Sequence, residues 1–286
     1  MMIKRKRYLE EIRKVVGKQV IKVLLGMRRV GKSTLLLQIQ EELLTKKKKK
    51  EQIISLNFEW LEFESLKEYK VLYEYIESKK DNGKKSYVFL DEVQEVEGFE
   101  KVVNSLNSKG ETEVFITGSN SKLLSGELAT YLTGRFYTIE VLPLSYKEVS
   151  EGFLKTEDVF LEYLRTGGMP GKFQFEEDRT AKNYLMDMYQ SILLRDIVKR
   201  YNIRDVDLLQ RFMLYLINNI GQIFSAGTIT NYLKNEGRKL SKETIYNYIE
   251  AAKNTYLIYG VPRYNIKGKE IMKTNEKYFI NDLGIR

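Results

Sequence analysis

The chain has 286 residues, of which 43% are hydrophobic and 30% charged, and its net charge is +9. It contains no cysteine and no histidine, which excludes disulfides, thiolate or imidazole metal sites and histidine-assisted nucleophiles. Any catalysis must therefore rest on carboxylates, lysine, arginine and a hard metal ion. The length allows one large domain or two smaller ones.

The positive charge suits a polyanion partner, meaning a nucleotide, a nucleic acid or an acidic membrane surface, without choosing among them. No apolar run approaches the roughly 18 residues that a membrane helix needs. The basic start of the chain, residues 1–7, is not followed by an apolar segment of signal-peptide type. We therefore expect a cytoplasmic protein with no membrane span.

The first predicted elements surround a phosphate-binding loop. Apolar spacing predicts a short helix over residues 8–16 and a buried strand over 20–25. The next residues, Gly26 to Ser33, have two glycines separated by four residues and then Lys-Ser, and a helix is predicted to begin near Lys32. The strand, loop and helix together are the setting that this pattern requires. The alternative is a glycine-containing turn that happens to carry a lysine.

Each residue type in this loop has a physical reason. Glycine permits positive φ and lets backbone N–H groups approach phosphate oxygens, while the helix start adds the positive end of its dipole. We expect Lys32 to bridge the outer phosphates of ATP and the Ser33 hydroxyl to join the Mg²⁺ shell. The residues predicted to bind the nucleotide are Gly26, Arg29, Val30, Gly31, Lys32, Ser33 and Thr34.

The pattern continues as alternating strands and helices. Strands are predicted over residues 52–58, 87–90, 114–117 and 136–141, and helices over 65–80 and 122–134. Five lysines at 46–50 are expected to form a solvated loop. Polar residues collect at the strand ends, which indicates a mostly parallel sheet with its ligand at the carboxyl edge. We predict an α/β core of the P-loop NTPase class over residues 1–144.

Two carboxylates, Asp91 and Glu92, follow the predicted strand 87–90. In a phosphate-loop ATPase, an acidic residue at a strand end holds Mg²⁺, and an adjacent glutamate can polarise the attacking water. We expect Asp91 to bind the metal with Ser33, and Glu92 and Lys32 to act in catalysis. The plain alternative is a strand that ends in a charged loop.

Three further residues, Ser119, Asn120 and Arg135, each have a functional and a structural interpretation. Ser119 or Asn120, at the end of the next strand, could contact the attacking water or the γ-phosphate, or could cap the following helix. Arg135 follows Gly134 at a predicted helix end, where the helix dipole alone could explain a cation. Its functional interpretation is an arginine finger that reaches the nucleotide of a neighbouring subunit.

The pattern changes after Pro143. Helices predicted over 146–150, 159–164 and 178–200, with no strand among them, indicate a helical lid over residues 145–204. Over 205–286 the chain predicts helices at 206–220 and 225–233, a third from Ser241, and strands at 256–264 and 277–280. This order suggests a winged helix-turn-helix whose recognition helix begins at Ser241. Arg28 and Arg29 are expected to be solvent-facing charges, with contact to the lid or a partner as the alternative.

The ordered segments 26–34, 89–92, 116–120, 132–136 and 142–145 together resemble bacterial and archaeal AAA+ ATPases of the AAA_14 type. The resemblance continues through 167–170, 194–197 and 277–284, so it covers nearly the whole chain. It implies nucleotide and Mg²⁺ binding by Lys32 and Ser33, hydrolysis by Asp91 and Glu92, and a sensor at Ser119 or Asn120. It also implies a finger-like role for Arg135, and makes Arg195 a candidate second nucleotide sensor.

Members of that family are normally followed by a DUF4143 domain, which resembles restriction-endonuclease folds, so we expect a truncated or short member. The leading hypothesis is a Mg²⁺-dependent AAA+ ATPase that couples nucleotide state to a C-terminal module. The alternative is a nucleotide-gated DNA- or protein-binding switch with little hydrolysis, and Glu92 argues against a small-molecule kinase.

Some residues favour DNA binding and others oppose it. Four basic residues near the predicted wing favour it, whereas Glu243 and Glu250 on the predicted recognition helix oppose it; the basic residues are Lys267, Lys269, Lys273 and Lys277. The partners to consider are therefore ATP, duplex DNA and, through Arg135, a second copy of the chain.

Overall fold

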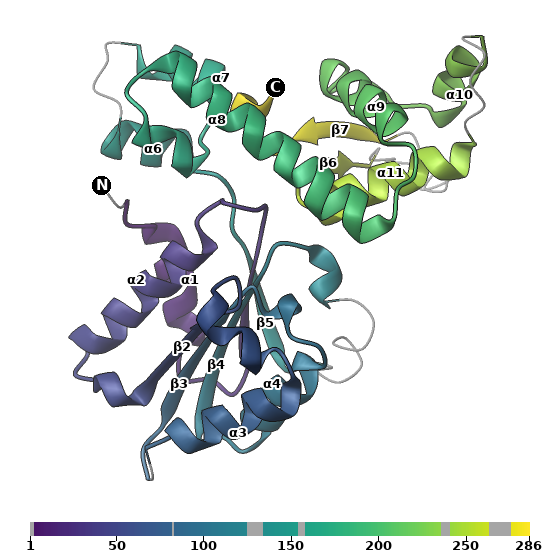
Figure 1. Ribbon diagram of the computed structural model, residues 1–286. Coiled ribbons are helices and arrows are strands. Elements are labelled where there is room, and N and C mark those ends of the chain that lie inside the picture. The colour runs from purple at the N-terminus through teal and green to yellow at the C-terminus, as the bar shows by residue number, and fades with distance from the viewer. Residues whose placement is uncertain (1–2, 82, 125–133, 154–157, 236–240, 263–275) are drawn as a thin grey trace, which may run out of the picture. The chain divides into compact units, whose positions relative to one another are not determined.

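The computed structural model describes residues 3–81, 83–124, 134–153, 158–235, 241–262 and 276–286 (Figure 1). The chain divides into two compact units, Met1–Leu142 and Pro143–Arg286. Among the residues that the structure describes, no helix combines the length and apolar character that crossing a membrane requires.

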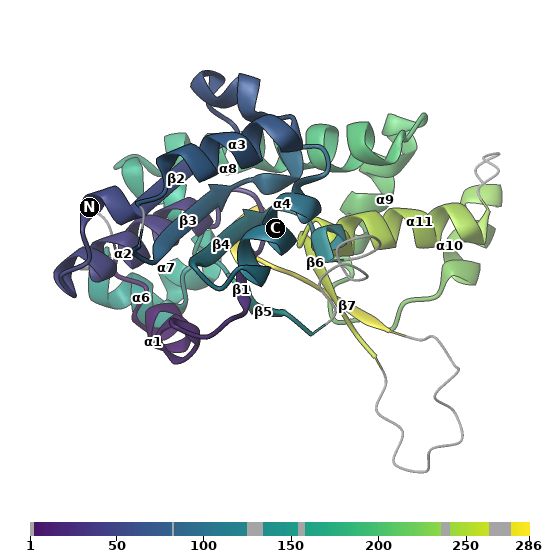
Figure 2. The same cartoon turned by 90° about the horizontal axis from the view of Figure 1, so that it is seen from below.

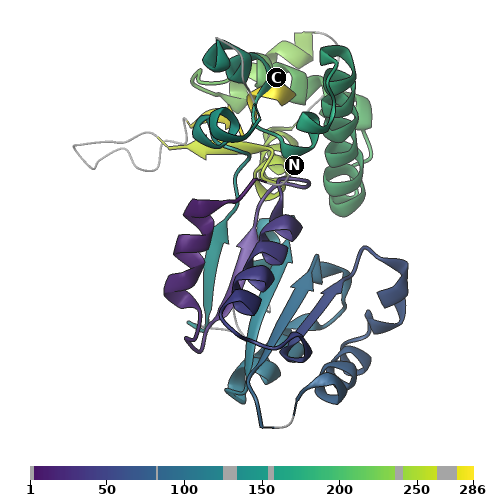
Figure 3. The same ribbon diagram turned by 90° about the vertical axis from the view of Figure 1, so that its left-hand side faces the viewer.

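The first unit is built on a five-stranded parallel sheet in the order β2-β3-β4-β1-β5, whose strands run in one direction (Figure 3). Strands β1, β3 and β4 are buried along their whole length, as near-continuous apolar runs of a covered parallel sheet require. The predicted α/β core is confirmed. The strands are β1 (Ile21–Leu25), β2 (Ile53–Asn57), β3 (Ser86–Asp91), β4 (Thr112–Gly118) and β5 (Phe136–Glu140).

Helix α2 connects β1 to β2, and this connection crosses the sheet from β1 towards the β2 edge. Helices α3 and α4 connect β2 to β3 and β3 to β4, and these two connections run in the opposite direction along the sheet. Right-handed crossovers therefore place α2 on one face and α3 and α4 on the other, and α1 packs against α2 (Figure 1). The helices are α1 (Lys6–Val15), α2 (Lys32–Thr45), α3 (Tyr69–Lys79) and α4 (Phe99–Ser108).

Two helical segments differ from expectation. Helix α4 was not predicted, although Phe99, Val102, Val103 and Leu106 have the spacing of an apolar helix face. Of the helix predicted over 122–134, residues 122–124 belong to the 3₁₀ turn η4 (Ser121–Leu124), and residues 125–133 lie outside the described part of the chain.

A buried ion pair lies near the amino edge of this sheet. The Lys22 Nζ is 2.7 Å from Glu113 Oε1, and both side chains are almost fully buried. Lys85 Nζ is 3.1 Å from the other carboxylate oxygen, and the Gly17 amide donates to Oε1 at 2.8 Å. Burial lowers the pKa of Lys22, and its hydrogen bond to Glu113 opposes that shift. The buried Lys22 ammonium therefore depends on the Glu113 carboxylate for compensation.

The second unit is mainly helical, as predicted. Helix α8 (Asp178–Ser191) runs directly into a π-helical stretch, η6 (Ile192–Lys199), so the helix expected over 178–200 is continuous but changes its hydrogen-bond register. The other helices are α6 (Tyr146–Gly152), α7 (Val159–Thr166), α9 (Val206–Asn218), α10 (Ala226–Asn235) and α11 (Lys242–Asn254).

Strands β6 (Ile258–Val261) and β7 (Lys277–Ile280) pair antiparallel, with α11 packed on β6 and α9 on β7 (Figure 2). The Ser241 side chain caps α11 by accepting a hydrogen bond from the Thr244 amide at 3.1 Å, as its predicted N-cap role requires. Residues 263–275, with the predicted wing lysines Lys267, Lys269 and Lys273, lie outside the described residues.

In the second unit, residues 167–168 contact Asp282 and Gly284 in a glycine-rich junction. Asp282 Oδ2 accepts a hydrogen bond from the Gly168 amide at 2.6 Å, and Oδ1 accepts one from the Gly284 amide at 2.9 Å. A Cβ on Gly167 would lie 2.2 Å from Asp282 Oδ1, and one on Gly168 would lie 2.0 Å from the Leu144 carbonyl oxygen. The close packing explains why both segments of the sequence require glycine.

We expect Glu113→Gln to lower the free energy of unfolding by roughly 3 kcal/mol or more, because it leaves the Lys22 ammonium buried without its carboxylate. Urea unfolding followed by circular dichroism measures this change. The exposed neighbour Glu111 provides the matched control, Glu111→Gln, which should unfold like the wild type. Equal stability of both variants would contradict the assigned role of the pair.

Burial lowers the pKa of Lys172 to about 8. Between that value and the ordinary 10.5, the unfolded chain binds more protons than the folded protein, so this residue makes stability rise with pH across the window. The wild type should therefore gain stability relative to Lys172→Met as the pH rises from about 7.5 to about 9.5. Urea unfolding at both pH values tests this, with the exposed Lys182→Met as control; a pH-independent difference for Lys172→Met would contradict it.

Candidate active site

The loop between β1 and α2 has an unusual backbone. Positive φ angles occur at Gly26 (154°), Arg29 (61°) and Gly31 (100°). A Cβ on Gly26 would lie 2.2 Å from the carbonyl oxygen of Val141, so glycine is required there. Helix α2 begins at Lys32, as predicted, with Gly31 as its N-cap residue. Amides of the first helical turn have no partner within the helix, so this end of α2 can bind an anion.

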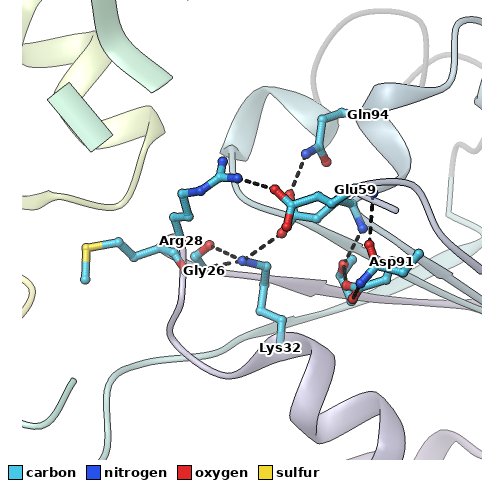
Figure 4. Close-up of polar contacts among 10 residues, drawn as sticks. Gly26, Arg28, Lys32, Glu59, Asp91 and Gln94 are labelled. Atoms are coloured by element: carbon cyan, nitrogen blue, oxygen red, sulfur yellow. Dashed lines mark hydrogen bonds and ion pairs between the residues drawn. The ribbon is translucent and has the colours of Figure 1, made fainter. Parts of the chain in front are cut away.

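Lys32 is folded back over this loop. Its ammonium donates hydrogen bonds to the carbonyl oxygens of Gly26 at 3.1 Å and Met27 at 3.2 Å, and lies 3.3 Å from Glu92 Oε1 (Figure 4). The Lys32 side chain is only 3% exposed. A buried cation of the loop is therefore compensated by a carboxylate from the end of β3.

Asp91 ends β3 and is surrounded by polar donors. Its Oδ2 accepts from Asn57 Nδ2 at 3.1 Å, and its Oδ1 accepts from the Thr117 hydroxyl (Figure 4). Burial raises the pKa of Asp91, while hydrogen bonds with Ser33 and Thr117 act in the opposite direction. The Ser33 hydroxyl and the Asp91 carboxylate thus lie together at the start of α2.

These oxygens fit a magnesium ion. Mg²⁺ binds oxygen ligands and commonly uses one or two protein groups, with waters and substrate phosphates completing the shell. Ser33 and Asp91 supply that number at the loop. No group of three or more His, Cys, Asp or Glu side chains with metal-binding geometry occurs among the described residues.

Glu92 is held from three sides. Its φ angle is 53°, and its amide donates to Thr117 Oγ1 at 2.8 Å. Gln94 Nε2 donates to Glu92 Oε2 at 2.5 Å, while Oε1 faces Lys32. Burial alone would raise the pKa of Glu92, but the Lys32 charge, the Gln94 hydrogen bond and the Arg28 charge outweigh it and lower the pKa. The carboxylate therefore remains ionised and able to accept a proton.

Ser119 and Asn120 are both buried at the end of β4. Asn120 Oδ1 accepts from the Lys122 amide at 2.8 Å, so this side chain caps the following turn. Within the described chain, Ser119 Oγ and Asn120 Nδ2 have no hydrogen-bond partner. Asn120 thus caps the turn that follows β4, as the structural alternative predicted, and its Nδ2 can still donate a hydrogen bond.

Arg28 differs from expectation. Its side chain is only 13% exposed and pairs with Glu59, which follows β2, instead of facing solvent (Figure 4). Arg29 is exposed, as expected. Among the other predicted loop residues, Val30 is buried, Ser33 is exposed and Thr34 is half-buried.

Arg135 and Arg195 are both exposed. Arg135 immediately precedes β5, and its carbonyl oxygen accepts from the Ile21 amide at the amino end of β1. The loop of residues 26–33 follows the carboxyl end of β1. Because β5 pairs parallel with β1 and a strand rises about 3.3 Å per residue, Arg135 lies at the amino ends of the strands, away from the loop of the same chain. Arg195 belongs to η6 in the second unit.

Sequence reasoning missed several residues that position this site. Thr117 belongs to the segment 116–120 that resembles the family, but no role was predicted for it. In the structure it contacts both acidic residues. Asn57 could have been found, because it is a polar residue at the carboxyl end of a strand. Glu59 gave no signal in the sequence, because only the fold brings it to Arg28. Gln94 follows Glu92 by two residues, but its contact depends on the conformation of the local turn, which the sequence did not indicate.

The chain matches two family descriptions. An AAA domain, AAA_14, matches residues 18–150, and a domain of unknown function, DUF8612, matches residues 157–286. The second match is to DUF8612 and not to DUF4143, so the more specific expectation for the C-terminal part is not confirmed.

Two longer proteins are similar in sequence. An uncharacterized protein of Haemophilus influenzae is 37% identical over 292 residues, covering 100% of this chain and 73% of that protein. The uncharacterized protein MJ1544 of Methanocaldococcus jannaschii is 34% identical over 269 residues, covering 88% of this chain and 58% of that protein.

Solved structures are less similar. Cdc6p from Pyrobaculum aerophilum has a TM-score of 0.43 at 13% identity, covering 98% of this chain and 90% of that one. AMPPCP-bound DnaA from Aquifex aeolicus has a TM-score of 0.41 at 17% identity, covering 87% of each chain. The Aeropyrum pernix ORC1 protein in complex with DNA has a TM-score of 0.40 at 10% identity, covering 99% of this chain and 90% of that one. Likenesses this weak carry no information about function.

Proposed function

Because this chain belongs to the family of the Haemophilus influenzae protein and has an AAA domain over residues 18–150, we propose that it binds and hydrolyses ATP with Mg²⁺. One observation carries the proposal: Lys32 and Glu92 are 3.3 Å apart beside the Ser33–Asp91 contact, at the carboxyl edge of the parallel sheet. Phosphate loop, metal ligands and candidate base thereby share one site.

The residues act in the following roles. Loop amides between Gly26 and Ser33 bind the phosphates. The Lys32 ammonium gives up its ion pair with Glu92 and contacts the outer phosphates instead. Ser33 and Asp91 hold Mg²⁺, which when bound neutralises charge on the phosphates. Glu92 then accepts a proton from the attacking water.

The polar atoms of Ser119 and Asn120 that lack partners among the described residues suit a sensor of the γ-phosphate. Arg135, at the far edge of the sheet from its own loop, suits a role towards a second copy of the chain. Such a trans-acting cation stabilises transition-state charge. Arg195 stays a candidate for a second sensor.

We further propose that nucleotide state acts on the second unit, as a lid over 145–204 and a winged helix-turn-helix over 205–286. The order of α9, α10, α11, β6 and β7 supports the latter. On α11, Lys242, Tyr246 and Asn247 are exposed and available to duplex DNA. Lys253 is less suited to that role, because its ammonium is 3.6 Å from Glu276.

Hydrolysis is tested with two variants. Glu92→Gln should retain ATP binding but lower kcat by about 100-fold or more, because the general base is lost. Lys32→Ala should weaken ATP binding itself, because a phosphate contact is lost. Phosphate release and equilibrium binding of a fluorescent ATP analogue measure the two effects, with the exposed Glu97→Gln as control. Slow release that is unchanged in Glu92→Gln would instead favour a nucleotide-gated switch with little hydrolysis.

DNA contact is tested on α11. Lys242→Glu should weaken binding to duplex DNA of any sequence and reduce the slope of log affinity against log salt by about one, because a phosphate contact is lost. Fluorescence anisotropy at several salt concentrations measures this. Lys14→Glu, an exposed change of equal charge in the first unit, is the control. Equal losses in both variants, or affinity that does not depend on salt, would contradict a DNA interface on α11.

A further inference from the structure

Gln94 lies in the 3₁₀ turn η3 (Val93–Glu95), directly after the acidic pair. Its Nε2 donates to Glu92 Oε2 at 2.5 Å (Figure 4). Its Oε1 is buried, and a Cβ placed on Gly118 would lie 3.1 Å from that oxygen. The amide thus extends from the Glu92 carboxylate to the end of β4.

The Oε1 atom of Gln94 has no hydrogen-bond partner among the described residues. The same is true of Ser119 Oγ and Asn120 Nδ2, which belong to the residues that follow Gly118. Buried polar atoms in native proteins are nearly always paired with protein groups or ordered water. Gln94 Oε1 lies beside Gly118, and the other two atoms belong to the two residues that follow Gly118. Unpaired polar atoms at one strand end are the kind of partners that a bound water requires.

The donors and acceptors in this group are complementary for a water molecule. Glu92 and Gln94 Oε1 can each accept one of its protons, and Asn120 Nδ2 can donate to its oxygen. A water held in this way has both protons directed to acceptors. The lone pair that remains on its oxygen is available for attack.

Gln94 also controls the carboxylate itself. In this structure Glu92 Oε1 faces Lys32 and Oε2 accepts from Gln94. When Lys32 turns to the phosphates, the contact with Gln94 remains as the bond that orients the carboxylate. An amide suits both tasks, because one end donates to Glu92 and the other accepts from water.

We propose that Gln94 is a positioning residue that orients Glu92 and the attacking water; this rests on the proposed hydrolysis of ATP. In that step the water oxygen bonds to the γ-phosphorus, and the bond from this phosphorus to the bridging oxygen breaks with its electron pair on ADP. A proton of the water passes to Glu92, while Gln94 neither gains nor loses one.

Two variants separate the functions of the amide. Gln94→Met keeps the length of the side chain and removes both hydrogen bonds. Gln94→Glu keeps an acceptor but cannot donate to Glu92 and adds a like charge beside it. Both should lower kcat by about tenfold or more with little change in KM, as for an interaction formed only in the transition state.

A second measurement does not depend on turnover. Both variants should bind ADP with aluminium fluoride, a mimic of the transition state, about tenfold or more weakly than the wild type, and a non-hydrolysable ATP analogue equally well. The exposed Gln222→Met is the control, and thermal unfolding identifies any variant that does not fold. A residue that only stabilises the turn would affect both ligands alike.

The outcomes are distinct. If the wild type hydrolyses ATP, Glu92→Gln does not, and both Gln94 variants match the wild type, then the role of Gln94 is wrong while the proposed function stands. If the wild type and Glu92→Gln do not differ in hydrolysis, both proposals are wrong. A selective loss of kcat and of affinity for the aluminium fluoride complex would support the role of Gln94.

Discussion

The hydroxyl of Thr117 is the contact on which the geometry of the candidate site depends. It donates to Asp91 and accepts from the Glu92 amide, so one side chain of β4 holds both acidic residues at the end of β3. The pairing of Leu90 with Ile116 places these residues side by side at the carboxyl edge. The parallel sheet thereby aligns the acidic pair with the loop that follows β1, and the positive φ of Glu92 turns its side chain towards Lys32.

Charge compensation is the second principle of the site. Lys32 and Arg28 both come from the loop, and each is paired with a carboxylate from a different strand end, Glu92 or Glu59. Under the proposed function, phosphates that entered the loop would compete with these carboxylates for the cations. Anion binding and rearrangement of the acidic residues would then be linked through the same two cations.

The sequence was most informative where one physical requirement determines a residue. The glycines and Lys32 predicted the loop, and the apolar runs predicted β1, β3 and β4, because a covered parallel strand must be apolar throughout. It was less informative for α4, whose short apolar pattern of Val102, Val103 and Leu106 did not lead to a predicted helix. It could not predict the contacts of Thr117, because these depend on which strand ends the fold brings together. The contact of Gln94 with Glu92 is local and depends on the conformation of the turn that follows Asp91. The match of residues 157–286 to DUF8612 was not predicted from the sequence.

The junction around Asp282 has a consequence for how the chain acquires its structure. The bond between Asp282 and the Gly168 amide joins residues 114 positions apart, within a unit that otherwise consists largely of local helices. Contacts at such separation form late, because the intervening chain must first be ordered. During synthesis the first unit can therefore fold while the second is still emerging, and the second unit gains its closing contact only after Asp282 has left the ribosome.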